Sequence, residues 1–144
     1  MLNLALVYQA KANEYIGNGD IESAKIAVSK ASKNLDECKP LLDASFENMK
    51  NSGISDDDDI EQYLLKFRPL RLQCHKLTGQ LFASSRDFVS CEKEFRSATE
   101  NFPNEPGAWD MLARVLDIQG KTDEGKLAKE KVQTLTKLNN AFGR

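Results

Sequence analysis

The chain has little of the chemistry that enzymes and metal proteins use: one histidine, one tryptophan and three cysteines among 144 residues. A single histidine excludes the paired-histidine zinc motifs. The cysteines, Cys38, Cys74 and Cys91, are odd in number and lack metal-ligand spacing, so they fit neither a metal site nor a complete disulfide framework. We expect three reduced, buried thiols, which predicts an intracellular protein in the cytoplasm, with the nucleus as an alternative.

An excess of charge of one sign is missing as well. Lysine and arginine number 20 against 22 aspartate and glutamate residues, a formal net charge of -2, so neither a nucleic acid nor an anionic membrane is the expected partner. No apolar run approaches the ~20 residues of a membrane helix, and the apolar start from Leu2 to Val7 lacks the basic flank and cleavage site of a signal peptide. A chain of 144 residues with 40% hydrophobic residues predicts a single domain, residues 1–144.

Catalytic motifs are also absent, since the sequence has no glycine-rich phosphate loop and no nucleophile elbow. Cys74 and His75 are neighbours, but adjacent residues on a helix point about 100° apart and cannot hydrogen-bond to each other, so His75 is predicted to pack at a helix contact. The run Asp56–Asp59 lacks the alternating ligands, central glycine and final glutamate of a calcium loop, and is predicted to cap a helix N-terminus. We expect no catalytic residue, no cofactor and no metal.

What the sequence does contain is apolar residues spaced three and four apart, the pattern of helices with one buried stripe. The first helix is predicted over residues 2–16, and Asp20 is the expected N-cap of the second. The second stripe keeps its phase through Pro40, which favours a kinked or nearly continuous helix to about Met49. Its members are Ile21, Ala24, Val28, Ala31, Leu35, Cys38, Leu42 and Met49.

A third stripe passes through Pro69 and predicts another long helix, with a kink near Lys66 because of the proline. Two long helices joined by a short acidic loop should pair as an antiparallel, coiled-coil-like arm at residues 39–71. The members of the third stripe are Ile60, Leu64, Phe67, Leu70, Cys74, Leu77 and Leu81.

Three further helices complete an all-α fold of about six helices. Asp87 is the expected N-cap of the fourth, Pro106 lies in the first turn of the fifth, and Thr122 is the expected cap of the sixth. The residues predicted to face inward are Phe88, Cys91, Phe95 and Ala98, then Trp109, Leu112, Leu116 and Ile118, and finally Ala128, Val132, Leu135 and Leu138.

Small and aromatic residues recur within these helices at fixed intervals. From Leu72 onward they are Gly79, Phe82, Cys91, Phe95, Ala98 and Pro103. This spacing resembles a tetratricopeptide repeat, a helix-turn-helix unit of about 34 residues. Compatible frames cover residues 5–38, 72–105 and 106–139, with 39–71 as an insertion that extends two helices; a degenerate fourth repeat in 39–71 is the alternative. His75 stands at the usual tryptophan position, and Gly125 and Lys129 depart from the pattern in the last frame.

The resemblance implies a protein–protein interaction module, a scaffold or adaptor subunit that holds a peptide or helix of a partner in a groove lined by first helices. It places twelve residues on this groove: Leu6, Gln9, Asn13 and Ile16, then Gln73, Lys76, Gln80 and Ala83, then Gly107, Asp110, Arg114 and Asp117. A clamp for a chaperone carboxylate is excluded, because Gln9 stands where that subset of the family has lysine.

Two other functions remain open from the sequence. Heptad-like stripes pair between chains as easily as within one, so the 39–71 arm or the apolar N-terminal helix could build an oligomer. The placement of Trp109 and Pro103 suggests an RNA-binding repeat of the half-a-TPR type, which the lack of a basic face makes the weaker alternative.

Overall fold

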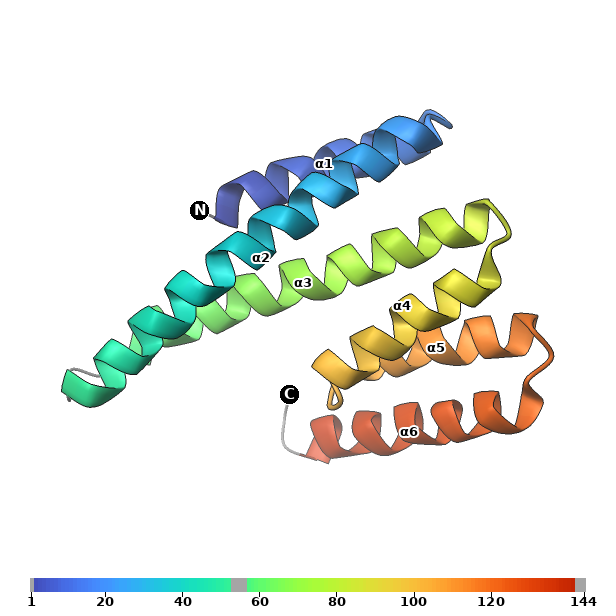
Figure 1. Ribbon diagram of the computed structural model, residues 1–144. Helices are drawn as coiled ribbons and strands as arrows, with labels where there is room; N and C mark the ends of the chain where they lie inside the picture. Colours follow the sequence, from blue (N-terminus) through green and yellow to red (C-terminus); the bar gives the residue numbers. More distant parts are fainter. Residues whose placement is uncertain (1, 53–56, 142–144) are drawn as a thin grey trace. The chain divides into compact units, whose positions relative to one another are not determined.

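The computed structural model describes the backbone of residues 2–52 and 57–141, and the side chains of 3–40 and 66–141 together with Ala44 and Glu47. All regular secondary structure in these residues is α-helical, which confirms the all-α prediction (Figure 1). The helices are α1 (Leu2–Gly17), α2 (Ile21–Ser52), α3 (Asp57–Ser84), α4 (Phe88–Asn101), α5 (Pro106–Ile118) and α6 (Thr122–Ala141).

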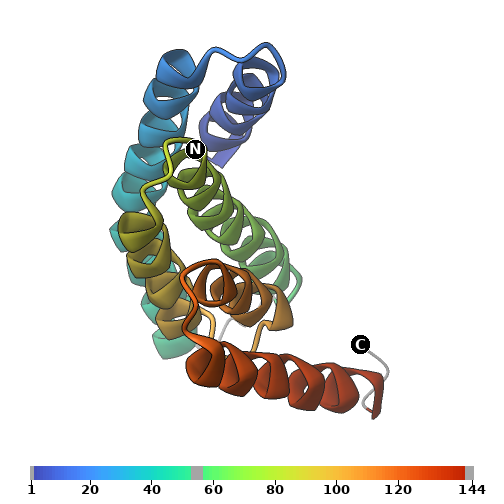
Figure 2. The same ribbon diagram turned by 90° about the vertical axis from the view of Figure 1, so that its right-hand side faces the viewer.

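The chain divides into two compact units, unit 1 (residues 1–74) and unit 2 (residues 75–144), with the boundary inside α3. In unit 1, α1 packs along α2, and in unit 2, α5 packs along α4 and α6 (Figure 2). Helical hairpins of this kind agree with the predicted element order, while the three repeat frames and a single domain stay predictions.

The connections between helices follow the predicted turn chemistry. The Asp20 carboxylate accepts the Ser23 N–H at 3.1 Å and the Asp87 carboxylate accepts the Ser90 N–H at 3.2 Å, so both are N-caps as predicted. Hydrogen bonds from Ser23 lower the pKa of Asp20. Arg86, just before the second cap, has a φ of 58°, a left-handed conformation that carries a steric cost for a side chain larger than glycine.

The predicted N-cap of α6 is wrong by one position along the chain. Thr122 is the first residue of α6 rather than its N-cap, and its hydroxyl donates to the Gly120 carbonyl instead of accepting an N–H. Gly120, with a φ of 75°, makes the turn that ends α5.

Both prolines of the long helices lie inside a helix, Pro40 in α2 and Pro69 in α3, so each helix continues past its proline as predicted, and the kinks stay predictions. In unit 1 the first part of α3 runs antiparallel to α2 (Figure 1), and Arg71 of α3 pairs with Asp36 of α2 at 2.6 Å. The stripe positions Leu42, Met49, Ile60 and Leu64 lie outside the described side chains, as does Asp56, while the other three aspartates of that run begin α3.

Small residues let α1 approach α2 closely in unit 1. Ala5, Ala12 and Ala24 are completely buried, and the backbone N–H of Ala5 donates to the Asn34 side chain of α2 at 3.1 Å. Because an alanine seam keeps the two backbones near each other, larger side chains must pack at its sides. The core cluster of the unit comprises Ala5, Ala31, Leu35 and Cys74, with Tyr8, Phe67 and Leu70 against it.

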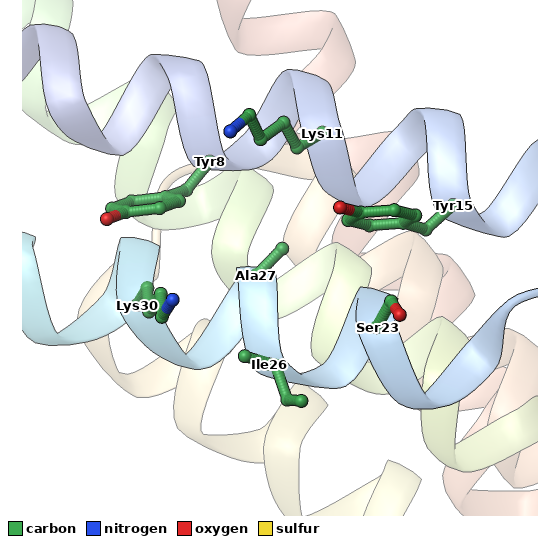
Figure 3. A pocket seen from close by; sticks show the side chains of 7 residues that line it. All are labelled: Tyr8, Lys11, Tyr15, Ser23, Ile26, Ala27 and Lys30. Atoms are coloured by element: carbon green, nitrogen blue, oxygen red, sulfur yellow. The ribbon is translucent and has the colours of Figure 1, made fainter.

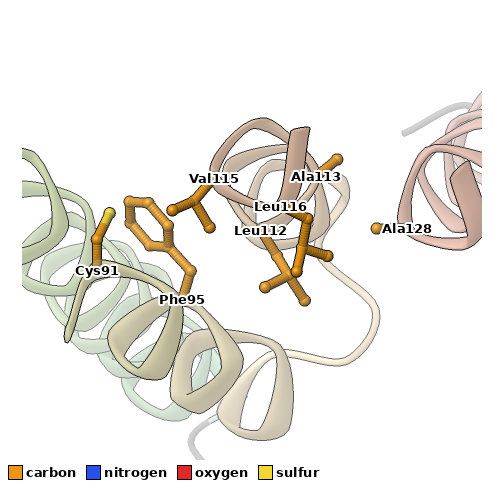
Figure 4. Packing of buried hydrophobic residues seen from close by; sticks show 7 residues of the cluster. All are labelled: Cys91, Phe95, Leu112, Ala113, Val115, Leu116 and Ala128. Carbon is orange, nitrogen blue, oxygen red and sulfur yellow. The ribbon is translucent and has the colours of Figure 1, made fainter. Parts of the chain in front are cut away.

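The core of unit 2 is built around Phe95 of α4. Its ring packs on Gly79 of α3 and belongs to a cluster with Cys91 of the same helix and residues of α5 and α6 (Figure 4). The buried members of the cluster are Cys91, Phe95, Leu112, Ala113, Val115, Leu116 and Ala128.

Two residues that the sequence predicted to face inward are exposed instead. Ile118 is 60% exposed and Leu138 is 48% exposed. Ile118 is the last residue of α5, where Val115 and Leu116 already fill the inner face, so the helix turns Ile118 toward solvent. On α6, Leu135 is the last residue of the stripe that is buried.

The Gly79–Phe95 contact generates a stability test. A Cβ built on Gly79 would overlap the Phe95 ring, whereas one on Gly107 meets no atom within 4 Å. We expect Gly79→Ala to lower the free energy of unfolding by about 1–3 kcal/mol, as overpacking of a filled core does. The matched variant Gly107→Ala should leave it unchanged or raise it by up to about 1 kcal/mol. Urea denaturation measures both; equal values for the two variants would contradict the close approach.

Candidate functional site

The predicted groove residues of α1 have different surroundings. Gln9 is buried, only 4% exposed, and its amide donates to the Leu70 carbonyl at 2.6 Å and to the Cys74 sulfur at 3.2 Å. The side chain of Gln9 thus joins α1 to α3 inside unit 1 and is withdrawn from the surface, which corrects its predicted place on a binding groove. Asn13 is exposed and Ile16 is half-buried.

The predicted residues of α3 and α5 are more accessible. Lys76 and Gln80 are exposed on successive turns of α3, and Gln73 is half-buried. On α5, Arg114 and Asp110 form an ion pair at 3.0 Å. Lys76, Gln80 and Arg114 thus give unit 2 polar positions that are open to solvent, whereas Gln73 belongs to unit 1.

Asp117, the last predicted residue of α5, is exposed and is held by Lys129 of α6 at 2.5 Å. A Cβ built on Gly125 would lie 2.5 Å from the Asp117 carboxylate. The absence of a side chain at Gly125 therefore leaves room for this ion pair between α5 and α6.

His75 is buried at the contact of α3 with α4, as predicted. Its Nδ1 lies 2.8 Å from the Glu94 carboxylate and its Nε2 lies 3.2 Å from the Asn101 amide. With the proton on Nδ1, the ring donates to Glu94 and accepts from Asn101, so both nitrogens are satisfied. The ring also meets Phe102 edge-on, with centroids 6.3 Å apart.

His75 and Cys74 therefore have separate partners. His75 contacts Glu94 and Asn101, whereas the Cys74 sulfur accepts from Gln9. Their adjacency in the sequence does not produce a thiol–imidazole pair.

Glu92 of α4 has the most shifted carboxyl among the described residues. Hydrogen bonds from Lys121, Arg96 and Gln119 lower its pKa to about 2, against the opposing effect of burial. The distances from Glu92 are 2.8 Å to Lys121, 2.9 Å to Arg96 and 2.9 Å to Gln119. A shifted pKa can indicate a functional site, but here both carboxylate oxygens are occupied by groups of the same unit, and Arg96 also pairs with Glu124.

The three cysteines are buried free thiols. Burial raises the pKa of Cys74, and burial together with Asp87 and Glu94 raises the pKa of Cys91 to about 11. Among the described residues no group of histidine, cysteine and carboxylate side chains could hold a metal ion, and no described helix is both long and apolar enough to cross a membrane.

A shallow pocket of about 160 Å³ opens between α1 and α2 of unit 1, and sequence analysis missed it (Figure 3). Two rows with the same spacing of three and four residues line it, Tyr8, Lys11 and Tyr15 from α1, and Ser23, Ile26 and Lys30 from α2, with Ala27 beside the second row. Equal spacing on both helices is the signal that could have revealed this pocket, because such residues share one side of each helix.

No family model matches the chain, and no curated protein matches it. Function is therefore inferred from the surfaces of the two units.

The Glu92 network predicts a pH dependence of stability. Because the folded-state pKa, about 2, lies below the ordinary value of 4.5, the network stabilises the fold above pH 4.5 and loses this effect as the pH falls toward 2. We expect Glu92→Gln to lower the free energy of unfolding by about 1 kcal/mol at neutral pH. The difference in the free energy of unfolding between wild type and Glu92→Gln should shrink as the pH falls from 4.5 toward 2. Urea titrations at several pH values measure it, with the exposed Glu100→Gln as control; a difference that stays constant down to pH 2 would refute the assignment.

Thiol accessibility is a second test of this subsection. Since Cys38, Cys74 and Cys91 are each no more than 3% exposed, a thiol-reactive dye should modify none of them rapidly in the native protein. All three should react after unfolding in guanidinium. Rapid native modification of any one, located by mass spectrometry, would show that its helix contact opens.

Proposed function

We propose that this chain is a protein–protein interaction module, a helical-repeat scaffold or adaptor subunit that binds a peptide or helix of a partner within a multiprotein assembly. The observation that carries the proposal is the outer α1 face, defined as Leu4, Leu6 and Val7. These side chains are 49%, 57% and 49% exposed, although they form the start of a helix whose inner side, at Ala5, is already buried.

A helix that is apolar on every side is normally enclosed by other structure. In its first two turns α1 exposes Leu4, Leu6 and Val7 on the sides of the helix away from the buried Ala5, and no charged residue precedes Lys11. Single exposed apolar residues are ordinary, whereas a cluster of them marks a surface for another protein. A partner that covers the outer α1 face would remove this apolar surface from water.

The resemblance to tetratricopeptide repeats supports the same class of function and adds a second surface. Lys76 and Gln80 on α3 and Arg114 on α5 are exposed positions that the resemblance assigns to partner binding. The proposed function includes no catalysis, cofactor or metal: the groups with reactive potential, His75 and Glu92, are engaged in joining helices. Three free thiols suit a reducing compartment, so we place the proposed module inside the cell.

Self-association is the second candidate, because the outer α1 face can be its own complement in a symmetric dimer. The partner would then be another copy of this chain. The two candidates differ in what the purified protein does alone: a dimer through this face exists without any other protein and dissociates on dilution.

Replacement of the outer α1 face tests the proposal. The double variant Leu6→Asp with Val7→Asp places two charges on it without touching the buried seam, so the fold should persist while partner binding falls at least tenfold. Quantitative capture from cell extract compares wild type, this variant and the control Val89→Asp, an isolated exposed residue on α4 that is 75% exposed. Capture of the same proteins by all three would remove this face from the proposed function.

Two further measurements complete this experiment. Loss of capture in Lys76→Ala with Gln80→Ala and Arg114→Ala would show that the α3 and α5 positions take part. Light scattering of the purified wild type at several concentrations detects a dimer, and a dimer that the α1 variant abolishes would establish the self-association candidate.

A further inference from the structure

The shallow pocket between α1 and α2 of unit 1 is open to solvent along both helices, and we call it the α1–α2 groove (Figure 3). It is a different surface from the groove that the repeat resemblance predicts. We infer that this groove binds a short acidic segment of a partner protein. One carboxylate of the segment lies between Lys11 and Lys30, and an adjacent aliphatic side chain packs against Tyr15 and Ile26. The inference rests on the proposed function as an interaction module, but it assigns a different surface from the outer α1 face.

The size of the groove decides the kind of ligand. Pockets for cofactors and drug-sized molecules have volumes of roughly 300–1,000 Å³, while this one has about 160 Å³. That space suits one or two amino-acid side chains and is too small to enclose a nucleotide or another cofactor. A peptide that lies across the groove can insert a side chain and leave its backbone in solvent.

The charge of the groove decides the sign of the ligand. Lys11 and Lys30 are both exposed, and neither has a carboxylate within ion-pair distance among the residues whose side chains the structure describes. The Lys30 amine lies over the Tyr8 ring, 5.6 Å from its centroid. Lys11 on α1 and Lys30 on α2 both line the groove, and two positive charges without a counter-charge among the described side chains favour an anion there.

The walls of the groove are apolar, which distinguishes the ligand from a simple anion. The rings of Tyr8 and Tyr15 lie on the α1 side, and Ile26, which is 58% exposed, lies on the α2 side (Figure 3). Aromatic rings flanked by lysines match a segment in which aliphatic and acidic residues alternate.

A random peptide library displayed on phage tests the inference and does not require the partner to be identified first. Selections use the folded wild-type chain, the double variant Lys11→Glu with Lys30→Glu, and the control Lys25→Glu. Lys25 is also on α2 but lies outside the groove and pairs with Glu22. We expect wild type and control to enrich peptides that carry aspartate or glutamate next to leucine, isoleucine or valine. The double variant should lose this enrichment.

The affinity of an enriched peptide, measured by fluorescence anisotropy, gives the second readout. Lys11→Gln and Lys30→Gln should each weaken binding about fivefold to tenfold, and added salt should reduce the difference. Ile26→Gln should remove the preference for an aliphatic residue while it leaves the acidic preference in place. Circular dichroism establishes that each variant is folded, which all should be because these positions are exposed.

The outcomes separate this inference from the proposed function. Enrichment without acidic residues, enrichment that survives in the double variant, or no enrichment by wild type would each overturn the acidic-peptide site. If the partner captured from cell extract binds the groove variants normally but not the outer α1 variant, the interaction function stands and the groove assignment falls. Binding of an RNA that the same lysine variants abolish would also overturn the peptide assignment.

Discussion

Close approach of helix backbones at small buried residues is the constraint on which each unit depends. In unit 2 the edge of the Phe95 ring occupies the space that a side chain at Gly79 would need. In unit 1 the seam between α1 and α2 is made of Ala5, Ala12 and Ala24, all fully buried. Interiors are packed as densely as organic crystals, so a methyl group at such a contact must displace either a side chain or a backbone.

The same constraint shapes the surface. Because alanines occupy the seam in unit 1, the larger residues of α1 stand beside it, and Tyr8 and Tyr15 become one wall of a groove whose other wall is α2. Among the described residues of unit 1, the polar side chain that is buried is that of Gln9, which donates to the Leu70 carbonyl. An unpaired amide at that depth would cost about 1–3 kcal/mol, so this hydrogen bond is a condition of burying Gln9. The seam thus determines which side chains are structural and which remain available to a ligand.

Much of the fold was predictable from local chemistry. Asp20 and Asp87 are N-caps because a carboxylate before an apolar stripe satisfies free N–H groups, and α2 continues through Pro40 because its apolar stripe keeps its phase there. Such rules act over one or two turns and do not depend on neighbouring helices. Ile118 shows their limit, since its exposure depends on where α5 ends relative to the residues that already fill its inner face.

The candidate sites were less predictable, because they depend on contacts between helices far apart in the sequence. Gln9 was placed on a groove by its repeat position, yet residues more than sixty positions away along the chain accept its hydrogen bonds. Conversely, the equal spacing of Tyr8, Lys11 and Tyr15 and of the facing α2 residues was visible in the sequence. The two rows form a groove only because α1 and α2 pack with these rows on the same side, and spacing within one helix does not determine that.

Some lysine and arginine side chains are paired with a carboxylate of the protein and others are not, and this difference indicates where a ligand anion can bind. Arg71, Arg96, Lys121 and Lys129 each hold a carboxylate of their own unit, and a ligand anion would have to displace that partner. Lys11 and Lys30 have no such competitor among the described side chains, so an incoming carboxylate meets no rival charge. Exposed ion pairs contribute little to stability, which means that two lysines kept unpaired beside tyrosine rings cost the fold little. The other shifted or buried ionisable groups of the described residues are engaged in packing, whereas charge and apolar surface remain free to act together in this α1–α2 groove.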